Sequence, residues 1–312
     1  MSIGSKPPYL QHLRSNHAHT VIRSATKEVL LGHDQKFCII GERINPTGRR
    51  IFQEQLRAGD LSAIERDVAA QVAGGAMILD INMGVPLTDE PDLLGRAIKL
   101  VQSITDLPIC IDSSVVEALE VGLAAYQGRA LVNSITAEDD RMAAILPLVK
   151  KYDAAVIALP NDHDEIPMEP EKRLALVDKI VRVATTEYGV PLADIVIDPL
   201  AMPIGADPQV GRSFFETVYA IRERYGINMT CGAGNNSFGM PGRDELGASF
   251  LPMAMAAGLT SAIMDARSPR MVSAVKAADV VMGNDEWGMA WIGDYRSKMA
   301  AAKAEAEAVA TR

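Results

Sequence analysis

Short apolar runs alternate with longer amphipathic stretches over most of the sequence, and this order restricts the fold more than any other feature. Eight runs have the length of a β-strand and are almost continuously apolar, which is typical of strands buried on both faces. They span 37–40, 77–82, 108–112, 130–133, 154–159, 195–198, 227–231 and 261–265. The stretches between them have helical spacing; over 62–73, for example, Ile64, Val68 and Val72 fall on one face. This order predicts a parallel sheet covered by helices.

The number of units predicts how the sheet is closed. Eight strand–helix units in about 230 residues favour a closed α/β barrel of the (β/α)8 TIM type, over residues 37–283, rather than an open doubly wound sheet. Residues 1–36 are expected to form an N-terminal extension that acts as a cap or a dimer contact, and residues 284–312 a C-terminal helical tail. The first strand is not followed by Gly-x-Gly-x-x-Gly, which argues against dinucleotide binding.

The charge and the cysteines restrict the class of partner and the compartment. The net charge of −9 argues against nucleic acid or an anionic membrane as the main partner, since both require a basic surface. No run of about 18 apolar residues is present, so no transmembrane helix is expected. Cys38, Cys110 and Cys231 lie inside apolar runs without paired spacing, which predicts buried thiols in a reducing cytoplasm and no metal site. We expect a cytoplasmic homodimer.

A stretch rich in glycine and asparagine, residues 230–243, contains the end of the seventh predicted strand and the loop after it. Gly232 and Gly234 allow a flat ligand to approach the backbone, and the amide of Asn235 or Asn236 can both donate and accept hydrogen bonds. Three earlier strands also end in a short polar residue: Asp112, Asn133 and Asp198. Because the carboxyl ends of parallel strands meet at one rim of a barrel, we expect these side chains to form the active site.

The predicted rim is rich in carboxylates and amides, and its strand ends carry no histidine or lysine for acid–base or Schiff-base chemistry. Further members are Asp80, Asn82 and Asp265. Several aspartates could hold a divalent metal, whereas interleaved amides suit an organic ligand with alternating donors and acceptors. A pterin is such a ligand, because N–H donors along the edge of its aminopyrimidinone ring fit the two oxygens of a carboxylate. A single aspartate at a strand end, such as Asp112, could instead cap the next helix.

Six motifs occur in the order found in a known family. They lie at 40–45 (Ile-Gly-Glu-Arg-Ile-Asn), 79–84, 111–113, 132–134, 197–200 (Ile-Asp-Pro-Leu) and 232–243. Together they resemble the pterin-binding methyltransferases, and within that group the methyltetrahydrofolate:corrinoid protein methyltransferases, which are also similar to the folate module of cobalamin-dependent methionine synthase. The resemblance extends over residues 37–283.

The resemblance implies a role for the polar strand ends. Asp112, Asn133 and Asp198 would hold the pterin ring. Asn235 would be the catalytic residue, reaching N5 of the pterin, the nitrogen that carries the methyl group. The implied enzyme is a methyltransferase that moves a methyl group between the cobalt of a corrinoid protein and N5 of tetrahydrofolate.

Three further positions match family residues close to the pterin or in the loop after the seventh strand: Asp80, Asn82 and Arg243. The sequence contains no Asp-x-His-x-x-Gly cobalamin-binding motif, so the corrinoid (cobalamin) is expected on a separate partner protein. The expected direction is formation of methyltetrahydrofolate during demethylation in one-carbon metabolism.

Two other functions remain open at this stage. One is dihydropteroate synthase, which has the same barrel and pterin pocket. Against it, the loop at 45–49 lacks the long Ser- and Asp-rich continuation of that enzyme, and Ser268-Pro269-Arg270 lacks its basic–histidine pair. The other is a non-catalytic barrel that binds folate in order to store or present it.

Overall fold

The computed structural model describes residues 19–163 and 166–310, so the first 18 residues of the predicted extension lie outside the described residues. The elements follow one another as β1 (Thr20–Arg23), β2 (Glu28–Leu31), β3 (Cys38–Ile44), α2 (Arg50–Arg57), α3 (Ser62–Gly74), β4 (Ile78–Asn82), α4 (Glu90–Ile104), β5 (Ile109–Asp112), α5 (Val116–Ala125), β6 (Leu131–Thr136), α6 (Asp139–Lys151), β7 (Ala155–Leu159), α7 (Pro170–Thr186), η2 (Leu192–Asp194), β8 (Ile195–Ile197), α8 (Val210–Tyr225), α9 (Ala233–Asn236), α10 (Arg243–Ala257), β9 (Ser261–Met264), α11 (Pro269–Met282), η3 (Glu286–Gly288) and α12 (Met289–Ala310).

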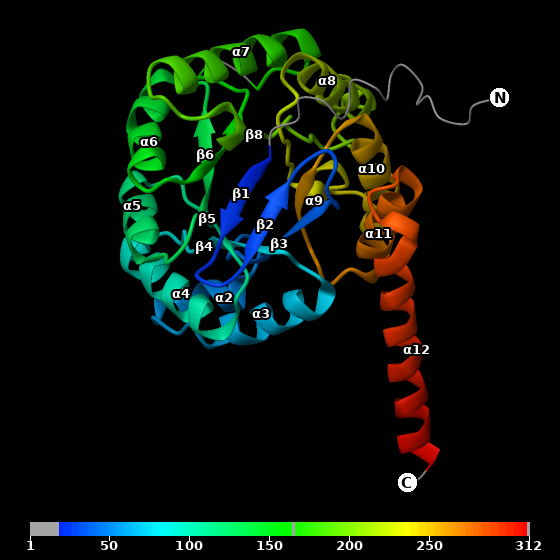
Figure 1. Ribbon diagram of the computed structural model, residues 1–312. Helices are drawn as coiled ribbons and strands as arrows, with labels where there is room; N and C mark the ends of the chain where they lie inside the picture. The colour runs from blue at the N-terminus through cyan, green and yellow to red at the C-terminus, as the bar shows by residue number, and fades with distance from the viewer. Residues whose placement is uncertain (1–18, 164–165, 311–312) are drawn as a thin grey trace, which may run out of the picture.

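The parallel strands close into a barrel. Seven of them form one sheet in the order β8-β7-β6-β5-β4-β3-β9. Residues 229–232 close the gap between β8 and β9, through the parallel pairs Ile197–Met229 and Gly232–Ile263. The helices surround this ring of strands (Figure 1). The predicted (β/α)8 barrel is confirmed.

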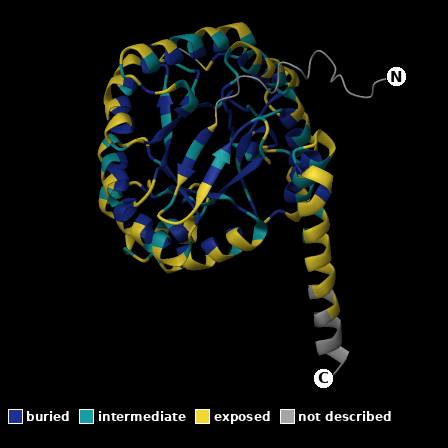
Figure 2. Cartoon of the chain, viewed as in Figure 1, coloured by how far each residue is buried: buried dark blue, intermediate teal, exposed yellow. Residues whose placement is uncertain are grey.

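Residues on each strand point alternately into the barrel and towards the helices. In the half of the barrel nearer the N-terminal ends of the strands, the inward residues form a buried apolar cluster. It comprises Cys38, Ile40, Ile78, Cys110, Leu131, Ala155, Ile157 and Val196. Outward positions, such as Ile39, Leu79 and Ile111, join a larger core with the helices. Figure 2 shows the same division, because the helices are buried on the side that faces the strands and exposed on the other.

Helix α3 corrects one detail of the predicted packing. Ile64 and Val68 are buried, but Val72 is 43% exposed. The inward place is taken instead by Gln71, whose side-chain oxygen accepts a hydrogen bond from the backbone N–H of Arg43 at 2.9 Å. Because β3 is irregular at this point, its N–H needs a partner outside the sheet, and a buried amide provides one.

The hairpin β1–β2 covers the N-terminal end of the barrel and crosses the centre of the ring in Figure 1. Its Ile22 and Leu31 are fully buried against the apolar cluster inside the barrel. Asn228, just before the seventh strand, donates hydrogen bonds to Thr20 Oγ1 at 2.9 Å and to the carbonyl of Leu31 at 3.0 Å. The sequence pattern does not predict these two strands, because runs of four residues carry little periodicity.

The sequence pattern does not predict helices α2 and α8. The C-terminal region is helical, as expected, and α12 projects away from the barrel (Figure 1). None of the described helices is both long and apolar enough to cross a membrane.

Candidate active site at the barrel mouth

Above the apolar cluster, the next inward position on most strands is polar. The alternation along each strand places these polar residues at the C-terminal mouth: Glu42, Asp80, Asn82, Asp112, Asn133, Asp198 and Asp265, with Gly232 at the corresponding position after the seventh strand. Active sites of (β/α)8 barrels lie at this end, because the loops after the strands build them. The structure therefore brings the polar strand ends singled out in the sequence to one rim.

Along this rim, each of two amides donates a hydrogen bond to a carboxylate. Asn82 Nδ2 donates to Asp112 Oδ2 at 3.1 Å, and Asn133 Nδ2 donates to Asp80 Oδ1 at 3.2 Å. The strand register explains the first contact, since Asn82 lies opposite Asp112. Asn133 also lies opposite Asp112, and its amide reaches past β5 to Asp80 on β4. Among the described residues, no hydrogen bond engages Asp112 Oδ1 or the amide oxygen of Asn133, so both oxygens are available to a ligand.

Burial makes these carboxylates weaker acids than usual. It raises the pKa of Asp80 to about 6, against the opposing effect of hydrogen bonds from Cys110 and Asn133. Burial, together with the negative charge of Asp80, raises the pKa of Asp112 well above its usual range, and the hydrogen bond from Asn82 opposes this. A ligand that presents N–H donors to the two groups would stabilise their ionised forms.

Asp198 lies across the mouth, directly after β8. Its Oδ1 accepts a hydrogen bond from the backbone N–H of Leu200 at 2.8 Å. Behind it lies Arg173 of α7, which is only 1% exposed and donates to the carbonyls of Pro167 and Pro199, both at 2.7 Å. Burial raises the pKa of Asp198 to about 6, while the Leu200 N–H and the Arg173 charge oppose the rise.

The alternative that these aspartates cap helices is wrong. The residue before α5 is Val115, and no side chain caps that helix, so Asp112 is not its cap. Asp198 is followed by a loop that continues to residue 209, before α8 begins. Side chains that accept hydrogen bonds from the first turn of a described helix include Asp89 for α4, Ser268 for α11 and Asp285 for α12.

Asn235 lies on α9, a single helical turn that follows the seventh strand immediately. A Cβ atom at Gly232 would lie 2.8 Å from Asn235 Nδ2, so the absence of a side chain at 232 allows the amide to fold back over the strand end. Asn235 is exposed, and Asn236 is 5% exposed. The turn thus presents the first amide, and not the second, to the open mouth.

Arg243 stabilises the turn that carries Asn235. Its Nη2 donates to the carbonyl of Gly234 at 2.8 Å, and its guanidinium lies 5.7 Å from the centre of the Phe238 ring. A Cβ atom at Gly234 would come within 3.2 Å of that Nη2, so a side chain at this position would crowd the guanidinium. Arg243 therefore contacts the loop that carries Asn235 rather than the ring of carboxylates.

Two charged residues at the site escaped the sequence-based prediction. Glu42 lies within the motif at 40–45, and its inward direction follows from its spacing of two from Ile40. Arg173 shares the buried face of α7 with Val177 and Ile180, so a charge at an apolar position of the helix was the available signal. Asp265, named from the sequence, is held by Arg267 through contacts of 2.8 and 2.7 Å.

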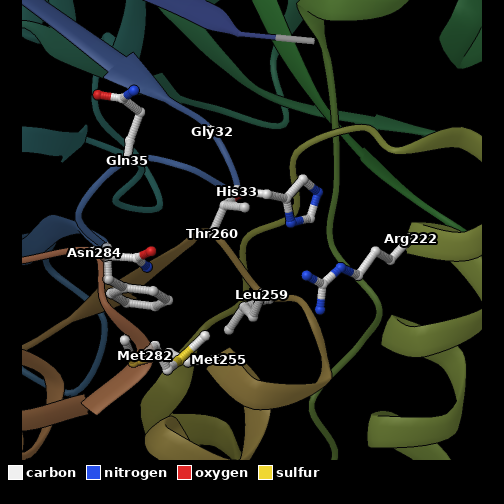
Figure 3. Close-up of a pocket in the computed structure, with 10 residues that line it drawn as sticks. Gly32, His33, Gln35, Arg222, Met255, Leu259, Thr260, Met282 and Asn284 are labelled. Atoms are coloured by element: carbon white, nitrogen blue, oxygen red, sulfur yellow. The ribbon is translucent and has the colours of Figure 1, made fainter. Parts of the chain in front are cut away.

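A small hollow lies at the opposite end of the barrel. Its lining includes His33, Arg222, Thr260 and Asn284, and Figure 3 shows His33 and Arg222 directed towards each other. His33 and Thr260 lie shortly before β3 and β9, at the N-terminal end of the strands. In (β/α)8 barrels that end serves stability. The hollow is therefore separate from the polar mouth.

A barrel whose mouth is lined with carboxylates and amides is the arrangement of an enzyme that binds a small polar ligand. The chain belongs to a particular family of such barrels, the pterin binding enzymes, because the sequence profile of that family matches residues 41–265.

Two relatives within this family have sequences similar to that of this chain. A methylcorrinoid:tetrahydrofolate methyltransferase from Eubacterium limosum is 32% identical over 253 residues, which cover 79% of this chain and 92% of the relative. Methionine synthase from Mycobacterium leprae is 32% identical over 244 residues, 73% of this chain, but the match covers only 20% of that much longer protein.

Solved structures agree on the fold. Dihydropteroate synthase from Xanthomonas albilineans, in complex with 7,8-dihydropteroate, has a TM-score of 0.63 at 17% identity and covers 84% of this chain and 98% of its own. The synthase from Thermus thermophilus, in complex with 6HMPPP, has a TM-score of 0.58 at 18% identity, with 83% and 98% covered. At this identity the likeness concerns the barrel alone.

Proposed function

We propose that this chain is a methyltransferase that moves a methyl group between the cobalt of a separate corrinoid protein and N5 of tetrahydrofolate. The observation that carries the proposal is the placement of Asp112, Asn133 and Asp198 on the same rim as Asn235. The similarity to the Eubacterium limosum enzyme, which extends over 92% of that relative, supports the same reaction.

In the proposed complex the pterin lies flat across the mouth. Its aminopyrimidinone edge has adjacent N–H donors, which match the oxygens of Asp112 and Asp198. The amide oxygen of Asn133 accepts a further N–H. The opposite ring then points towards the turn that carries Asn235, so N5 lies beneath the open mouth, where a partner protein can bring its cobalt.

The reaction is an in-line displacement at the methyl carbon. In the direction that forms methyltetrahydrofolate, the lone pair of N5 forms the new N–C bond. The Co–C bond breaks with its electron pair remaining on cobalt, and N5 releases its proton to a base. Alignment and stabilisation of charge on N5 are the main tasks of the protein. We favour this direction because the name of the Eubacterium limosum relative makes the methylcorrinoid the donor.

The activity is tested with methylcobalamin and tetrahydrofolate under anaerobic conditions. Formation of cob(I)alamin, followed by its absorbance, and of N5-methyltetrahydrofolate, detected by chromatography, are the expected results. Tight folate binding without transfer would identify a storage barrel instead. Turnover of a pterin pyrophosphate with p-aminobenzoate would identify a dihydropteroate synthase.

Replacing Asp198 by asparagine is expected to weaken tetrahydrofolate binding by about 10- to 150-fold, the equivalent of one charge-assisted hydrogen bond of about 1.5–3 kcal/mol. Asparagine has the same shape and keeps an acceptor for the Leu200 N–H, so the loop should stay in place. Calorimetric titration measures the effect. Asp106→Asn, at the surface near Lys27, is the matched control and should leave the affinity unchanged. Unaltered folate affinity in Asp198→Asn would remove Asp198 from the pterin site.

Folate affinity is also expected to fall as the pH drops below about 6. The pKa of Asp198 is raised to about 6, so the group is protonated below that value and ionised above it. Only the ionised form offers both oxygens to N–H donors. Titrations between pH 5 and 8 should show the loss of affinity at the acid end, and Asp198→Asn should flatten that part of the curve. A pH-independent affinity in the wild-type protein would contradict the proposed contact.

A further inference from the structure

We propose that Glu42 accepts the proton released by N5 during methyl transfer and returns it in the reverse direction. This inference rests on the proposed function. It arises from the position of the Glu42 carboxyl group, which has no part in holding the pterin ring.

Glu42 faces the mouth rather than the helices. On β3, Ile40 belongs to the buried cluster inside the barrel, and Glu42 is the next residue on the same side. The intervening Gly41 faces α3, where a Cβ atom would lie 2.4 Å from the side chain of Gln71. Glu42 therefore stands in the ring of polar strand ends, between β4 and β9.

Glu42 differs from the other carboxyl groups of the ring in having no donor. Asp80 accepts from Asn133, Asp112 from Asn82, Asp198 from the N–H of Leu200, and Asp265 from Arg267. Within residues 19–163 and 166–310, no hydrogen bond ends on the Glu42 carboxyl. Glu42 is half-buried, so its carboxyl oxygens can be reached from the mouth and are free to exchange a proton with a ligand there.

The charges around Glu42 suit a group that exchanges protons near neutral pH. Burial and the negative charges of Asp265 and Asp80 raise its pKa to about 7, while the positive charges of Arg43 and Arg243 oppose the rise. The two-point contact with Arg267 keeps the pKa of Asp265 low, so the negative charge beside Glu42 persists across the working range. A general base is most efficient when its pKa lies near the operating pH.

The order of strands places Glu42 on the side of the mouth where N5 would lie. Around the ring, β3 is followed by β9 and then by the strand that precedes Asn235, whereas Asp112 and Asn133 are on β5 and β6. Arg243 links the two groups, because its charge acts on Glu42 while its Nη2 holds Gly234 in the turn beside Asn235. A ring gripped by Asp112, Asn133 and Asp198 thus directs its other half towards Glu42 and Asn235.

Glu42 then accounts for the proton that N5 gives up. As the N–C bond forms, N5 becomes a cationic amine, and its proton passes to the Glu42 carboxylate directly or through one water. Asn235 stabilises the charge on N5, but an amide does not retain a proton. In reverse, the neutral Glu42 acid protonates N5 of methyltetrahydrofolate, and the amine leaves as the cobalt takes the methyl group.

The test is the pH profile of methyl transfer from methylcobalamin to tetrahydrofolate. Glu42→Gln should lower kcat by about 100-fold at pH 7, the lower end of the range for general acid–base catalysis. It should also abolish the inflection near pH 7 while the Kd for tetrahydrofolate stays within about twofold of wild type. Glu42→Asp should keep the inflection at a reduced rate. Glu54→Gln, on the exposed face of α2, is the matched control and should change neither quantity.

The outcomes separate this inference from the proposed function. If wild-type protein transfers methyl groups and Glu42→Gln keeps the inflection or more than half of the turnover, Glu42 has no part in proton transfer and the methyltransferase assignment stands. If the wild-type protein transfers no methyl group while binding tetrahydrofolate, the assignment itself fails. Loss of the inflection in Glu42→Gln but not in Asn235→Ala supports the proton-transfer role.

Discussion

Replacing Asn235 by alanine is expected to lower the turnover of methyl transfer by about 100-fold, within the range for the loss of one preorganised electrostatic stabiliser. The physical reason is that N5 gains positive charge as it takes the methyl group, and the amide oxygen faces that charge. The backbone should be unaffected, because Asn235 is exposed and the turn is held by Arg243 through the carbonyl of Gly234.

The measurement separates chemistry from binding. Single-turnover transfer from methylcobalamin reports the chemical step, and calorimetry reports tetrahydrofolate affinity, which should change much less because the pterin edge is held elsewhere. Asn284→Ala, at the opposite end of the barrel, is a matched control for the removal of an amide and should keep wild-type turnover. Turnover in Asn235→Ala within about threefold of wild type, against the expected factor of about 100, would exclude Asn235 from the transition state.

The sequence predicted the barrel because each strand is short and apolar and each helix repeats its apolar residues at a regular spacing. Where this signal is weak, elements were missed. The strands of the hairpin have four residues each, and α2 buries only Phe52 and Leu56. Helix α8 does bury Phe214, Val218 and Ile221, but its polar surroundings obscured the pattern. Local periodicity does not reveal which end of the barrel a short hairpin covers, because that depends on contacts distant in sequence.

The sequence predicted those site residues that lie at the ends of strands. Asp112, Asn133 and Asp198 terminate apolar runs, and parallel strands necessarily bring such ends together. The roles of Glu42 and Arg173 depend instead on three-dimensional surroundings. Glu42 acquires its properties from the charges of Asp265 and Asp80 on neighbouring strands. No pattern along the chain encodes that juxtaposition.

Arg173 illustrates how the fold maintains a buried carboxylate. An ionised aspartate away from water is unfavourable unless positive charge or N–H donors compensate it. Asp198 accepts hydrogen bonds from the backbone of Leu200 and of Gly232, and the charge of the Arg173 guanidinium also acts on it. The same guanidinium joins the loops after β7 and β8, because it donates to the carbonyls of Pro167 and Pro199. Loop position and Asp198 ionisation therefore depend on one side chain.

Replacing Arg173 by methionine is accordingly expected to lower the free energy of unfolding by about 3 kcal/mol at pH 7, at the lower end of the cost of leaving a buried charge uncompensated. Methionine fills much of the same space but leaves both carbonyls without a donor and raises the pKa of Asp198 further. Urea denaturation measures the loss, and Arg182→Met, on the exposed face of the same helix, is the matched control.

The pH dependence distinguishes charge compensation from packing. The pKa of Asp198 is about 6 in the wild-type protein and is expected to be higher in Arg173→Met. Below that pKa the carboxyl is neutral and no longer needs a positive neighbour, so the stability difference between the two proteins should shrink as the pH falls from 8 to 5. In an Asp198→Asn background the charge is absent at every pH, and the cost of Arg173→Met should be smaller and independent of pH. A cost that is the same at both pH values and in both backgrounds would show that Arg173 only ties the loops and does not support the ionised aspartate.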